Sequence, residues 1–516
     1  MASSALPHPG VPAIKVEQRG LLTLAVMLAM IMQILDTTIA NVALPHMQAS
    51  LGATLDTVTW VLTSYIVASA IAIPVTGWLS DRFGSRNLFL FAVGGFVVAS
   101  ALCGTAVNLE EMVAFRVLQG VCGAFISPLS QTVMLDINPP EKHARAMSIW
   151  GMGIMVGPVM GPVLGGWLTE NYNWRWVFYV NVPFGIVTLA LLWALLPSRP
   201  ISRRSFDIFG FSMLAIGLAA LQLVLDRGQG EDWFSSWEIR IEAGVAIAAL
   251  WLATVHLVTG KKILFNRSLF ADRNLVTGML FMIVIGVTTM APMALLPPML
   301  QQLYDYPVLD TGLLLAPRGI GVFITMAVSG QMMGRGVDPR WLVGTGMIIF
   351  AWSLWLMTQW SLDMSWGPVV TSGFIQGIGM GLVFIPLQTI AFSTLTPAQR
   401  TDGASLMNLF RNLGASIGIS AVTTMLARNL QISHADVGQH ITAGSLSALN
   451  LANAEGLGGI GQGAMAMVNA EVTRQALMIA YLDDFYLMLI LITIAFPLLF
   501  LLKKPAGRMP ASAPME

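Results

Sequence analysis

The sequence predicts an all-α polytopic membrane protein with fourteen transmembrane helices. Three observations predict this class: long apolar segments occupy most of the 516 residues, the composition is 55% hydrophobic and 10% charged, and the mean hydropathy is +0.72. A soluble domain would carry about 25% charged residues. A helix that crosses a bilayer needs about 20 mainly apolar residues, each rising about 1.5 Å.

Fourteen segments of the chain meet that requirement, and most of the connections between them are short. They lie near residues 21–45, 57–79, 87–106, 110–134, 146–168, 175–196, 206–226, 238–260, 274–298, 308–333, 340–360, 366–390, 402–428 and 478–502. Short connections favour antiparallel neighbours in a helical bundle.

The distribution of basic residues predicts the orientation. With the N-terminus in the cytoplasm, the cytoplasmic loops hold 19 of the 27 Lys and Arg residues, and the opposite loops hold five. Cytoplasmic loops retain Lys and Arg in this way. An even number of helices with both termini cytoplasmic is therefore expected.

A weak internal repeat predicts two six-helix halves. The fourth helix contains Phe-Arg-Val-Leu-Gln-Gly-Val-Cys-Gly at 115–123, and the twelfth contains Gly-Phe-Ile-Gln-Gly-Ile-Gly-Met-Gly at 373–381. Equivalent halves make the seventh and eighth helices an insertion, and such repeats are typical of transporters. The predicted domains are a cytoplasmic tail (1–20), an N-terminal six-helix bundle (21–196), a basic linker with two inserted helices (197–271), a C-terminal six-helix bundle (272–502) that includes a periplasmic loop (429–475), and a cytoplasmic tail (503–516).

The loop between helices two and three is dense in small and charged residues: Gly77, Asp81, Arg82, Gly84 and Arg86. Glycines permit a tight turn there. Asp81 is suited to cap the following helix and to pair with basic residues at the same membrane face.

Helix five carries glycines at every fourth position, with two prolines among them. Gly157, Gly161 and Gly165 fall close to one face, which lets another helix approach to backbone contact. Pro158 and Pro162 remove backbone hydrogen bonds. Packing alone explains the glycines, whereas the added prolines suggest a hinge between domains.

These motifs resemble the major facilitator superfamily. The loop motif matches at Asp81, Arg82, Gly84 and Arg86, with Ser85 in place of a common basic residue. The other matching positions are Arg116, Gln119, Gly120 and Gly123 in helix four, and Gly157, Gly161, Pro162, Gly165 and Gly166 in helix five, with Ser148 where many members have a glycine. The run from Leu35 to Pro45 in helix one resembles the fourteen-helix drug:proton antiporter branch. Asn181-Val-Pro-Phe-Gly185, Asp226-Arg-Gly and Asp232-Trp-Phe-Ser-Ser236 resemble its EmrB-type multidrug exporters.

Asp36 and Arg116 are the leading candidates for proton coupling. Asp36 lies nine residues before Pro45, and Arg116 six residues after Glu110, so both charges lie at comparable depth below the external surface. They could meet if their helices face one cavity. Protonation of Asp36 would then release Arg116. The alternatives are a static ion pair, or an Asp36 hydrogen-bonded to Thr37 or Thr38 for packing alone.

Arg318 and Arg411 lie near the membrane midplane, and no equally deep acid is expected in the second half of the chain, because Asp483 and Asp484 fall in the first turns of helix fourteen. Arg318 would attract an anionic or electron-rich substrate, or satisfy carbonyls freed by Pro317, and a structural role is favoured for Arg411. The candidate substrate-cavity residues are Asn41, Gln119, Arg318, Gln376 and Arg411.

Other function classes find little support. A primary pump needs a nucleotide site, and Gly260-Lys261-Lys262 does not fit a phosphate-binding loop. Neither a metal cluster nor a nucleophile–base set supports an enzyme, His434 and His440 have no supporting ligands, and there is no basic stripe for nucleic acid.

The resemblance implies a proton-driven exporter of hydrophobic or amphipathic drugs, without cofactor, in the bacterial inner membrane. It also implies a periplasmic EmrA-type adaptor and an outer-membrane TolC-type channel. The external loops 227–237 and 429–475 are candidate contacts, and 429–475 is either a flexible connector or a docking element. The alternative is a dedicated exporter or importer of one metabolite, such as a fatty acid or a siderophore.

Overall fold

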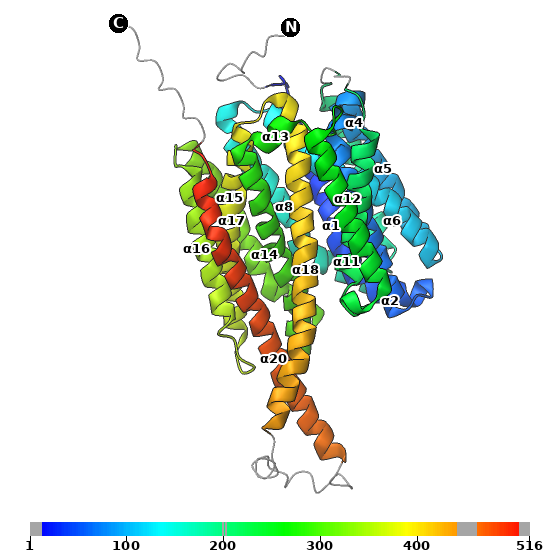
Figure 1. The fold of residues 1–516 in the computed structure, drawn as a ribbon, viewed down its shortest axis with the longest axis vertical. Helices are drawn as coiled ribbons and strands as arrows, with labels where there is room; N and C mark the ends of the chain where they lie inside the picture. Colours follow the sequence, from blue (N-terminus) through cyan, green and yellow to red (C-terminus); the bar gives the residue numbers. More distant parts are fainter. Residues whose placement is uncertain (1–12, 199–200, 202–203, 441–461, 505–516) are drawn as a thin grey trace.

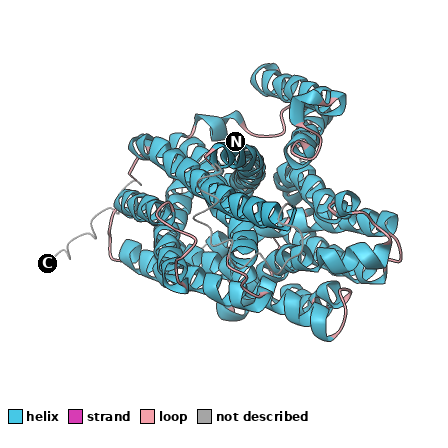
Figure 2. Cartoon of the chain, turned by 90° about the horizontal axis from the view of Figure 1, so that it is seen from below, coloured by secondary structure: helices cyan, strands magenta, loops and turns pink. Residues whose placement is uncertain are grey.

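The computed structural model describes residues 13–198, 201, 204–440 and 462–504, and within these ranges the chain is helical, with loops between the helices (Figures 1 and 2). Twelve of the described helices are long and apolar enough to cross a bilayer. Two further helices, α8 (His143–Asn171) and α18 (Arg400–Gln439), carry more polar and glycine residues but pack among the spanning helices. With them the fourteen-helix architecture is complete.

The first half of the chain forms one group of helices. Its elements are α1 (Arg19–Leu51), α2 (Leu55–Val58), α3 (Trp60–Ala72), η1 (Ile73–Val75), α4 (Thr76–Phe83), α5 (Ser85–Thr105), α6 (Leu109–Ala124), α7 (Ile126–Asp136), η2 (Pro140–Lys142), α8, α9 (Trp176–Tyr179) and α10 (Asn181–Leu195). The second spanning segment is divided at η1, where Pro74 supplies no backbone N–H.

The second half forms a similar group. Its elements are α13 (Arg267–Ala271), α14 (Arg273–Leu303), α15 (Val308–Gly334), α16 (Pro339–Met357), α17 (Trp366–Ser393), η4 (Pro397–Gln399), α18, α20 (Gln462–Ala495) and η6 (Phe496–Leu501). The same pairs of spanning segments pack in each half: first on fifth (α1 on α8, α14 on α18), second on fourth (α3 on α6, α15 on α17) and third on fourth (α5 on α6, α16 on α17). The predicted six-helix halves are therefore confirmed, and the repeated motifs of α6 and α17 occupy equivalent positions.

The halves meet along two seams that obey the same symmetry. The fifth segment of the first half, α8, packs on α15, and the fifth segment of the second half, α18, packs on η1 and α4 of the second segment. Between the halves in the sequence, α11 (Ile208–Arg227), η3 (Trp233–Ser235) and α12 (Trp237–Thr259) form a peripheral pair of spanning helices. α11 contacts α3, whereas most of α12 is exposed. The two inserted helices thus flank the first half.

The last long helices differ from the prediction. α18 continues to Gln439, and α20 already begins at Gln462. Residues 429–439 and 462–475 of the predicted 429–475 loop are therefore helical. The two helices project side by side beyond the other helices (Figure 1), joined by the His434 Nε2···Asn469 Oδ1 contact of 3.0 Å. Because hydropathy marks only the apolar part of a helix, it could not find these polar extensions. The rest of that loop, 441–461, lies outside the described residues, as do 1–12, 199–200, 202–203 and 505–516 of the predicted tails and linker.

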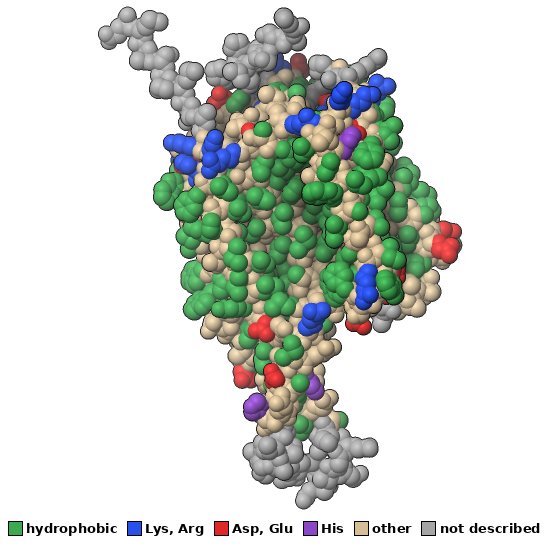
Figure 3. Space-filling model, viewed as in Figure 1, with side chains coloured by type: hydrophobic (Ala, Val, Ile, Leu, Met, Phe, Trp, Pro, Cys, Tyr) green, Lys and Arg blue, Asp and Glu red, His purple; other side chains and the backbone are tan. Residues whose placement is uncertain are grey.

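Both ends of the described chain lie at one end of the bundle, which we call the terminal end; the opposite end, from which α18 and α20 project, is the loop end (Figure 1). Lys and Arg side chains gather near the terminal end on the face drawn in Figure 3. The terminal end is the one that the distribution of basic residues predicts to be cytoplasmic.

Candidate functional site

A buried ion pair lies in the core of the first half. Nη1 of Arg116 in α6 lies 2.6 Å from Oδ2 of Asp36 in α1, and both side chains are 0% exposed. Asp36 lies near the middle of the 33-residue α1, which continues through Pro45 to Leu51. A buried carboxylate needs a cation and hydrogen bonds to offset its lost hydration, and this one has both.

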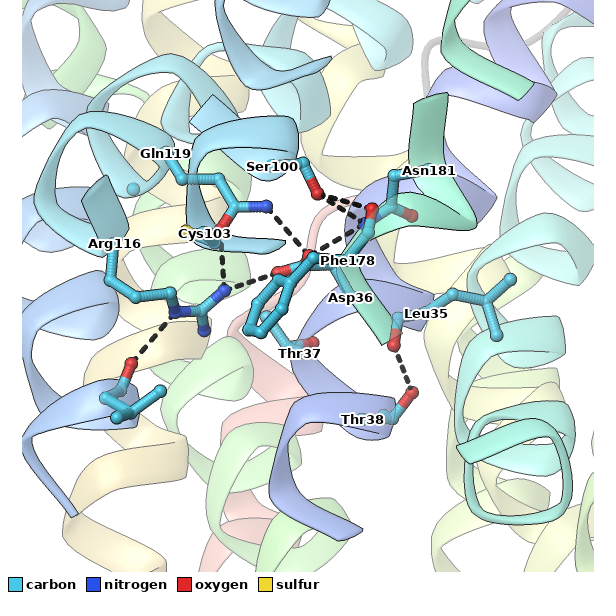
Figure 4. Close-up of polar contacts among 12 residues, drawn as sticks. Leu35, Asp36, Thr37, Thr38, Ser100, Cys103, Arg116, Gln119, Phe178 and Asn181 are labelled. Atoms are coloured by element: carbon cyan, nitrogen blue, oxygen red, sulfur yellow. Dashed lines mark hydrogen bonds and ion pairs between the residues drawn. The ribbon is translucent and has the colours of Figure 1, made fainter. Parts of the chain in front are cut away.

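Two amides complete the surroundings of Asp36 (Figure 4). The side-chain N–H groups of Gln119 and Asn181 donate to Oδ1 of Asp36 at 2.7 and 2.8 Å. The Asn181 amide also donates to Oγ of Ser100 at 3.0 Å, and Oε1 of Gln119 accepts from Arg116 at 2.7 Å. The site is therefore a closed polar cluster that joins α1, α5, α6 and α10.

The guanidinium of Arg116 has further partners. Its Nε donates to the carbonyl of Val61 in α3 at 2.9 Å, and its Cζ lies 4.5 Å from the centre of the Tyr65 ring. Nη2 of Arg116 has no hydrogen-bond partner among the described residues. Arg116 thus links α3 to the cluster, so a change in the charge of Asp36 would reach the second spanning segment, whose η1 and α4 pack on α18.

One of the alternatives for Asp36 is wrong. Thr37 donates its hydroxyl to the carbonyl of Ile34, and Thr38 donates to carbonyls of α1 and, at 3.2 Å, to that of Gly157 in α8. Neither hydroxyl bonds Asp36. The choice between a static ion pair and a proton-coupled one stays open at this point.

The glycines of α8 pack on the segment of α1 that carries Asp36. A Cβ on Gly157 would lie 2.3 Å from Cγ2 of Ile34, and one on Gly161 would lie 2.1 Å from Oγ1 of Thr38. One on Gly165 would lie 3.1 Å from Cγ2 of Ile39. The close approach that the spacing predicts is therefore made to α1, and it fixes the height of Asp36. The side chains of Pro158 and Pro162 lie outside the described ones, and their role as a hinge stays a prediction.

The loop motif between α4 and α5 forms part of a latch between the halves, which we define as Gly77, Asp81, Arg204 and Asp402. Arg204 follows α10 in the linker, and its Nε lies 3.1 Å from Oδ2 of Asp81. Its Nη1 and Nη2 donate to the two carboxylate oxygens of Asp402 in α18, at 2.9 and 3.0 Å. A Cβ on Gly77 would lie 1.6 Å from Oδ1 of Asp402, so only glycine permits this approach. Burial opposes the charge of Arg204, but the hydrogen bonds and charges of Asp402 and Asp81 raise the pKa of its guanidinium.

Other residues of the loop motif act locally. Gly84 has φ = +86°, a conformation that favours glycine, and it precedes α5 without a side-chain cap, so the predicted cap by Asp81 is wrong. Arg86 donates to the carbonyl of Trp193 in α10 at 2.6 Å, and Arg82 is exposed.

The terminal end of the seam between the halves is closed by further polar contacts. Nη1 of Arg400 in α18 lies 2.9 Å from Oδ1 of Asp136 at the end of α7. Deeper in the seam, the hydroxyl of Ser127 donates to Oδ1 of Asn408 at 2.7 Å. At the same seam, Gln131 donates to Oε1 of Gln388 at 2.6 Å. Ser127 lies nine residues before Asp136, so the sealed layer is about 14 Å thick.

The candidate cavity residues do not form one group. Gln119 belongs to the Asp36 cluster, and Asn41 is exposed near the loop end of α1. Arg318 donates to the carbonyl of Thr289 in α14 at 3.1 Å, so it does not serve the carbonyls freed by Pro317 in its own helix. Gln376 is buried with neither amide atom bonded, and among the described residues no hydrogen bond or ion pair is formed by the Arg411 side chain.

Three residues were not found from the sequence. Asn181 is part of a sequence motif but is not predicted as a partner of Asp36. Its polar side chain within an apolar helix is a signal that could have indicated this role. Arg204 was one of several linker cations and gave no signal of its own. The sequence predicts Asp484 in the first turns of its helix, but α20 begins 22 residues earlier. The carboxyl is fully buried, and among the described residues neither of its oxygens has a hydrogen-bond partner.

Comparisons with known proteins agree with this architecture. The family model described as Major Facilitator Superfamily matches residues 26–419. The chain is 36% identical over 502 residues to the fatty acid resistance protein FarB of Neisseria gonorrhoeae, covering 96% of this chain and 98% of FarB. It is 36% identical over 494 residues to the multidrug export protein EmrB of Escherichia coli K12, covering 95% and 96%.

Among solved structures, the human organic anion transporter MFSD10 superposes with a TM-score of 0.58 at 13% identity, covering 92% of this chain and 99% of that one, which supports the fold. Proteins of this superfamily are transporters without a cofactor and not enzymes. The chain belongs to the Major Facilitator Superfamily, where it is a relative of the multidrug export protein EmrB and the fatty acid resistance protein FarB.

Proposed function

We propose that this chain exchanges protons for hydrophobic or amphipathic compounds and exports those compounds by alternating access between its two halves. The observation that carries the proposal is the fully buried Asp36–Arg116 pair. An isolated ion pair in a bilayer protein is costly, so a functional role is the default expectation for it. The relatedness to EmrB, named as a multidrug exporter, supports the class of cargo.

The coupling follows from the contacts of Asp36. As an anion, Asp36 accepts three hydrogen bonds, from Arg116, Gln119 and Asn181. A proton on Asp36 removes the charge that holds Arg116 and occupies one acceptor oxygen, so the cluster must rearrange. Because Arg116 also bonds the carbonyl of Val61 in α3, the rearrangement reaches the segment whose far end carries the latch.

The proposed conformation is outward-facing, with the terminal end in the cytoplasm. The support is the layer of contacts at the terminal end, which the latch and the Asp136–Arg400 pair close. Export then requires these contacts to break and the seam between the halves to close at the opposite, loop end.

The test is substrate-driven proton movement in proteoliposomes, with Asp36→Asn as the variant and Asp363→Asn in an exposed loop as the matched control. We expect Asp36→Asn to insert and bind cargo, but to lose proton-driven accumulation. Asp363→Asn should behave as the parent protein does. Gradient-driven accumulation at the parent rate in Asp36→Asn would refute the proposal.

A second candidate is a dedicated transporter of one metabolite, such as a fatty acid. The observation in its favour is the 36% identity to FarB, which is named for fatty acid resistance and is covered over 98% of its length. A panel of hydrophobic cations, anions and uncouplers in the same proteoliposomes separates the two, because a polyspecific exporter moves several classes and a dedicated one moves a single class.

We also propose that the chain is the inner-membrane part of a tripartite system with an EmrA-type adaptor and a TolC-type channel. The projecting parts of α18 and α20 offer the contact surface, together with the 227–237 loop, in which Trp233 donates to Thr424 of α18 at 3.1 Å. Replacing 433–470 with a short Gly-Ser linker should abolish capture of a purified EmrA-type adaptor and preserve transport in proteoliposomes. Capture at parent levels by the shortened protein would count against this assignment.

A further inference from the structure

The second half of the molecule holds two arginines that have no acidic partner among the described residues. Arg318 lies in α15 and Arg411 in α18. Among the described residues, no carboxylate interacts with either guanidinium. Arg116 in the first half, by contrast, is paired with Asp36.

The two arginine residues lie at similar heights along α14. Arg318 donates to the carbonyl of Thr289, and a Cβ on Gly286 would lie 2.3 Å from the carbonyl oxygen of Arg411. Gly286 and Thr289 are three residues apart, so these contacts are separated by about 4.5 Å along the axis of α14. They fall in the middle of this 31-residue helix and therefore near the centre of the membrane.

The helices that carry the two arginines pack on other helices of the same half and across a seam between the halves. α18 packs on α14 and α20 and meets α7 across the seam, whereas α15 packs on α17 and meets α8 across the other seam. Both side chains are half-buried. A guanidinium at mid-membrane is costly unless it faces the protein interior or a watery space. The seam between the halves is the region that offers both a protein interior and a space that water can enter.

A third polar group of the same region also has no partner. Gln376 in α17 is 0% exposed, and neither its amide nitrogen nor its amide oxygen has a hydrogen-bond partner among the described residues. It lies between Gly373 and Gly377, and a Cβ on either glycine would meet the Arg318 residue, at 3.8 and 2.1 Å. A buried amide without partners is unfavourable and calls for a ligand or a water molecule.

The unused hydrogen-bonding capacity indicates the chemistry of the ligand. A guanidinium has five N–H donors, and Arg318 uses one protein carbonyl while Arg411 uses none. Carboxylates match the planar donor fork of arginine and form charge-assisted hydrogen bonds with it. Two cations without an acid also set a positive potential, which favours an anion over a cation or a neutral compound.

We infer that Arg318 and Arg411, with Gln376, form an anion-binding site at the membrane midplane of the C-terminal half, which takes the carboxylate of an amphipathic substrate. This site rests on the proposed transport function, because it assigns the charge of the cargo. It assigns the two halves different tasks: Asp36 and Arg116 in the first half hold the proton site, and the second half holds the anionic group.

The test is binding to the full chain in lipid nanodiscs, with three probes of equal chain length: decanoate, decanol and decyltrimethylammonium. Tryptophan fluorescence reports binding, and empty nanodiscs correct for partition into lipid. The variants are Arg318→Gln and Arg411→Gln, with the charge-retaining Arg318→Lys and Arg411→Lys. Arg428→Gln, exposed on the same helix α18, is the matched control.

We expect the parent protein to prefer decanoate to decanol by about tenfold, which corresponds to about 1.4 kcal/mol. Each Gln variant should lose that preference while decanol affinity stays near the parent value, which shows that the variant is folded. The Lys variants should keep most of it, and Arg428→Gln all of it. Decanoate binding that is unchanged in both Gln variants, or a parent preference for the ammonium probe, would overturn the inference.

The binding test needs no proton gradient, so its failure is distinct from failure of the proposed function. Decanoate selectivity in a protein that shows no proton-linked transport would overturn the transport proposal and support the site. Proton-linked transport by a protein without anion selectivity would support the transport proposal and overturn the anion-binding site.

Discussion

The two halves share one helix arrangement but treat their buried charges in opposite ways. In the first half, Asp36 and Arg116 are paired, and Gln119 and Asn181 bond the remaining carboxylate positions. In the second half, Arg318 and Arg411 have no acid, and the carboxyl of Asp484 has no hydrogen bond from the described residues. Packing that is the same in both halves therefore does not determine how the charges are satisfied.

The difference bears on what each half can do. A paired and hydrogen-bonded charge holds its neighbours in one geometry, and neutralising one member forces them to move. An unpartnered cation keeps its hydrogen-bonding capacity for a ligand. The first half is therefore suited to sense a proton, and the second to bind cargo.

The largest effect is expected from breaking the pair in the first half. Arg116→Ala leaves the Asp36 carboxylate buried without a cation, and this should destabilise the fold by about 3–5 kcal/mol. The double variant Asp36→Asn with Arg116→Gln removes both charges and should recover most of that loss. Thermal unfolding of purified protein in detergent measures both.

Arg411→Gln is the matched control in the second half, since it removes a half-buried guanidinium that has no acidic partner among the described residues. We expect its unfolding temperature to stay close to that of the parent protein. An equal fall in unfolding temperature for Arg116→Ala and Arg411→Gln would show that pairing with an acid makes no difference to the stability of the two halves.

A smaller effect is expected where the halves meet. Gly77→Ala would place a Cβ 1.6 Å from Oδ1 of Asp402 and displace this carboxylate from Arg204. Hydrogen bonds to charged groups contribute about 1.5–3 kcal/mol, so the closed state of the terminal end should lose about tenfold or more in population. Labelling of Gln388→Cys by a membrane-impermeant maleimide, from the terminal end, measures the change.

Arg204→Gln should increase this labelling as Gly77→Ala does, because it removes the other side of the same contact. Gly20→Ala is the control glycine, since a Cβ there meets nothing within 4 Å. If Gly77→Ala labels no faster than Gly20→Ala, the latch does not hold the halves together.

Most of the fold could be predicted from the sequence because apolar length dominates helix formation in a bilayer. The fourteen segments and the symmetric halves follow from hydropathy and a short repeat. The polar extensions of α18 and α20 could not be predicted in this way, because their residues pack on each other beyond the apolar region. That missed extension also misplaced Asp484, whose depth depends on where its helix begins.

Only the Asp36–Arg116 part of the candidate site could be predicted, because these two charges lie at comparable depth in the membrane. Asp36 and Arg116 are the unusual charges of their helices, so their meeting could be anticipated. Asn181 and Arg204 gain their partners from helices 145 and 198 residues away in the chain, and no local pattern carries that information. Arg318 and Arg411 could be named as deep charges, but that both contact α14 within one turn required the structure.

The smallest effect is expected for Asp484→Asn. An ionised carboxylate without a cation or a hydrogen bond is too costly to bury, so we expect the side chain of Asp484 to carry its proton. Asparagine is then a neutral substitute of the same shape, and the free energy of unfolding should change by less than about 1 kcal/mol. Proton-driven accumulation should persist, whereas Asp36→Asn should lose it. A large loss of stability in Asp484→Asn would mean that this carboxyl is charged and bound to a group outside the described residues, and the contrast between the two halves would then hold only for their arginines.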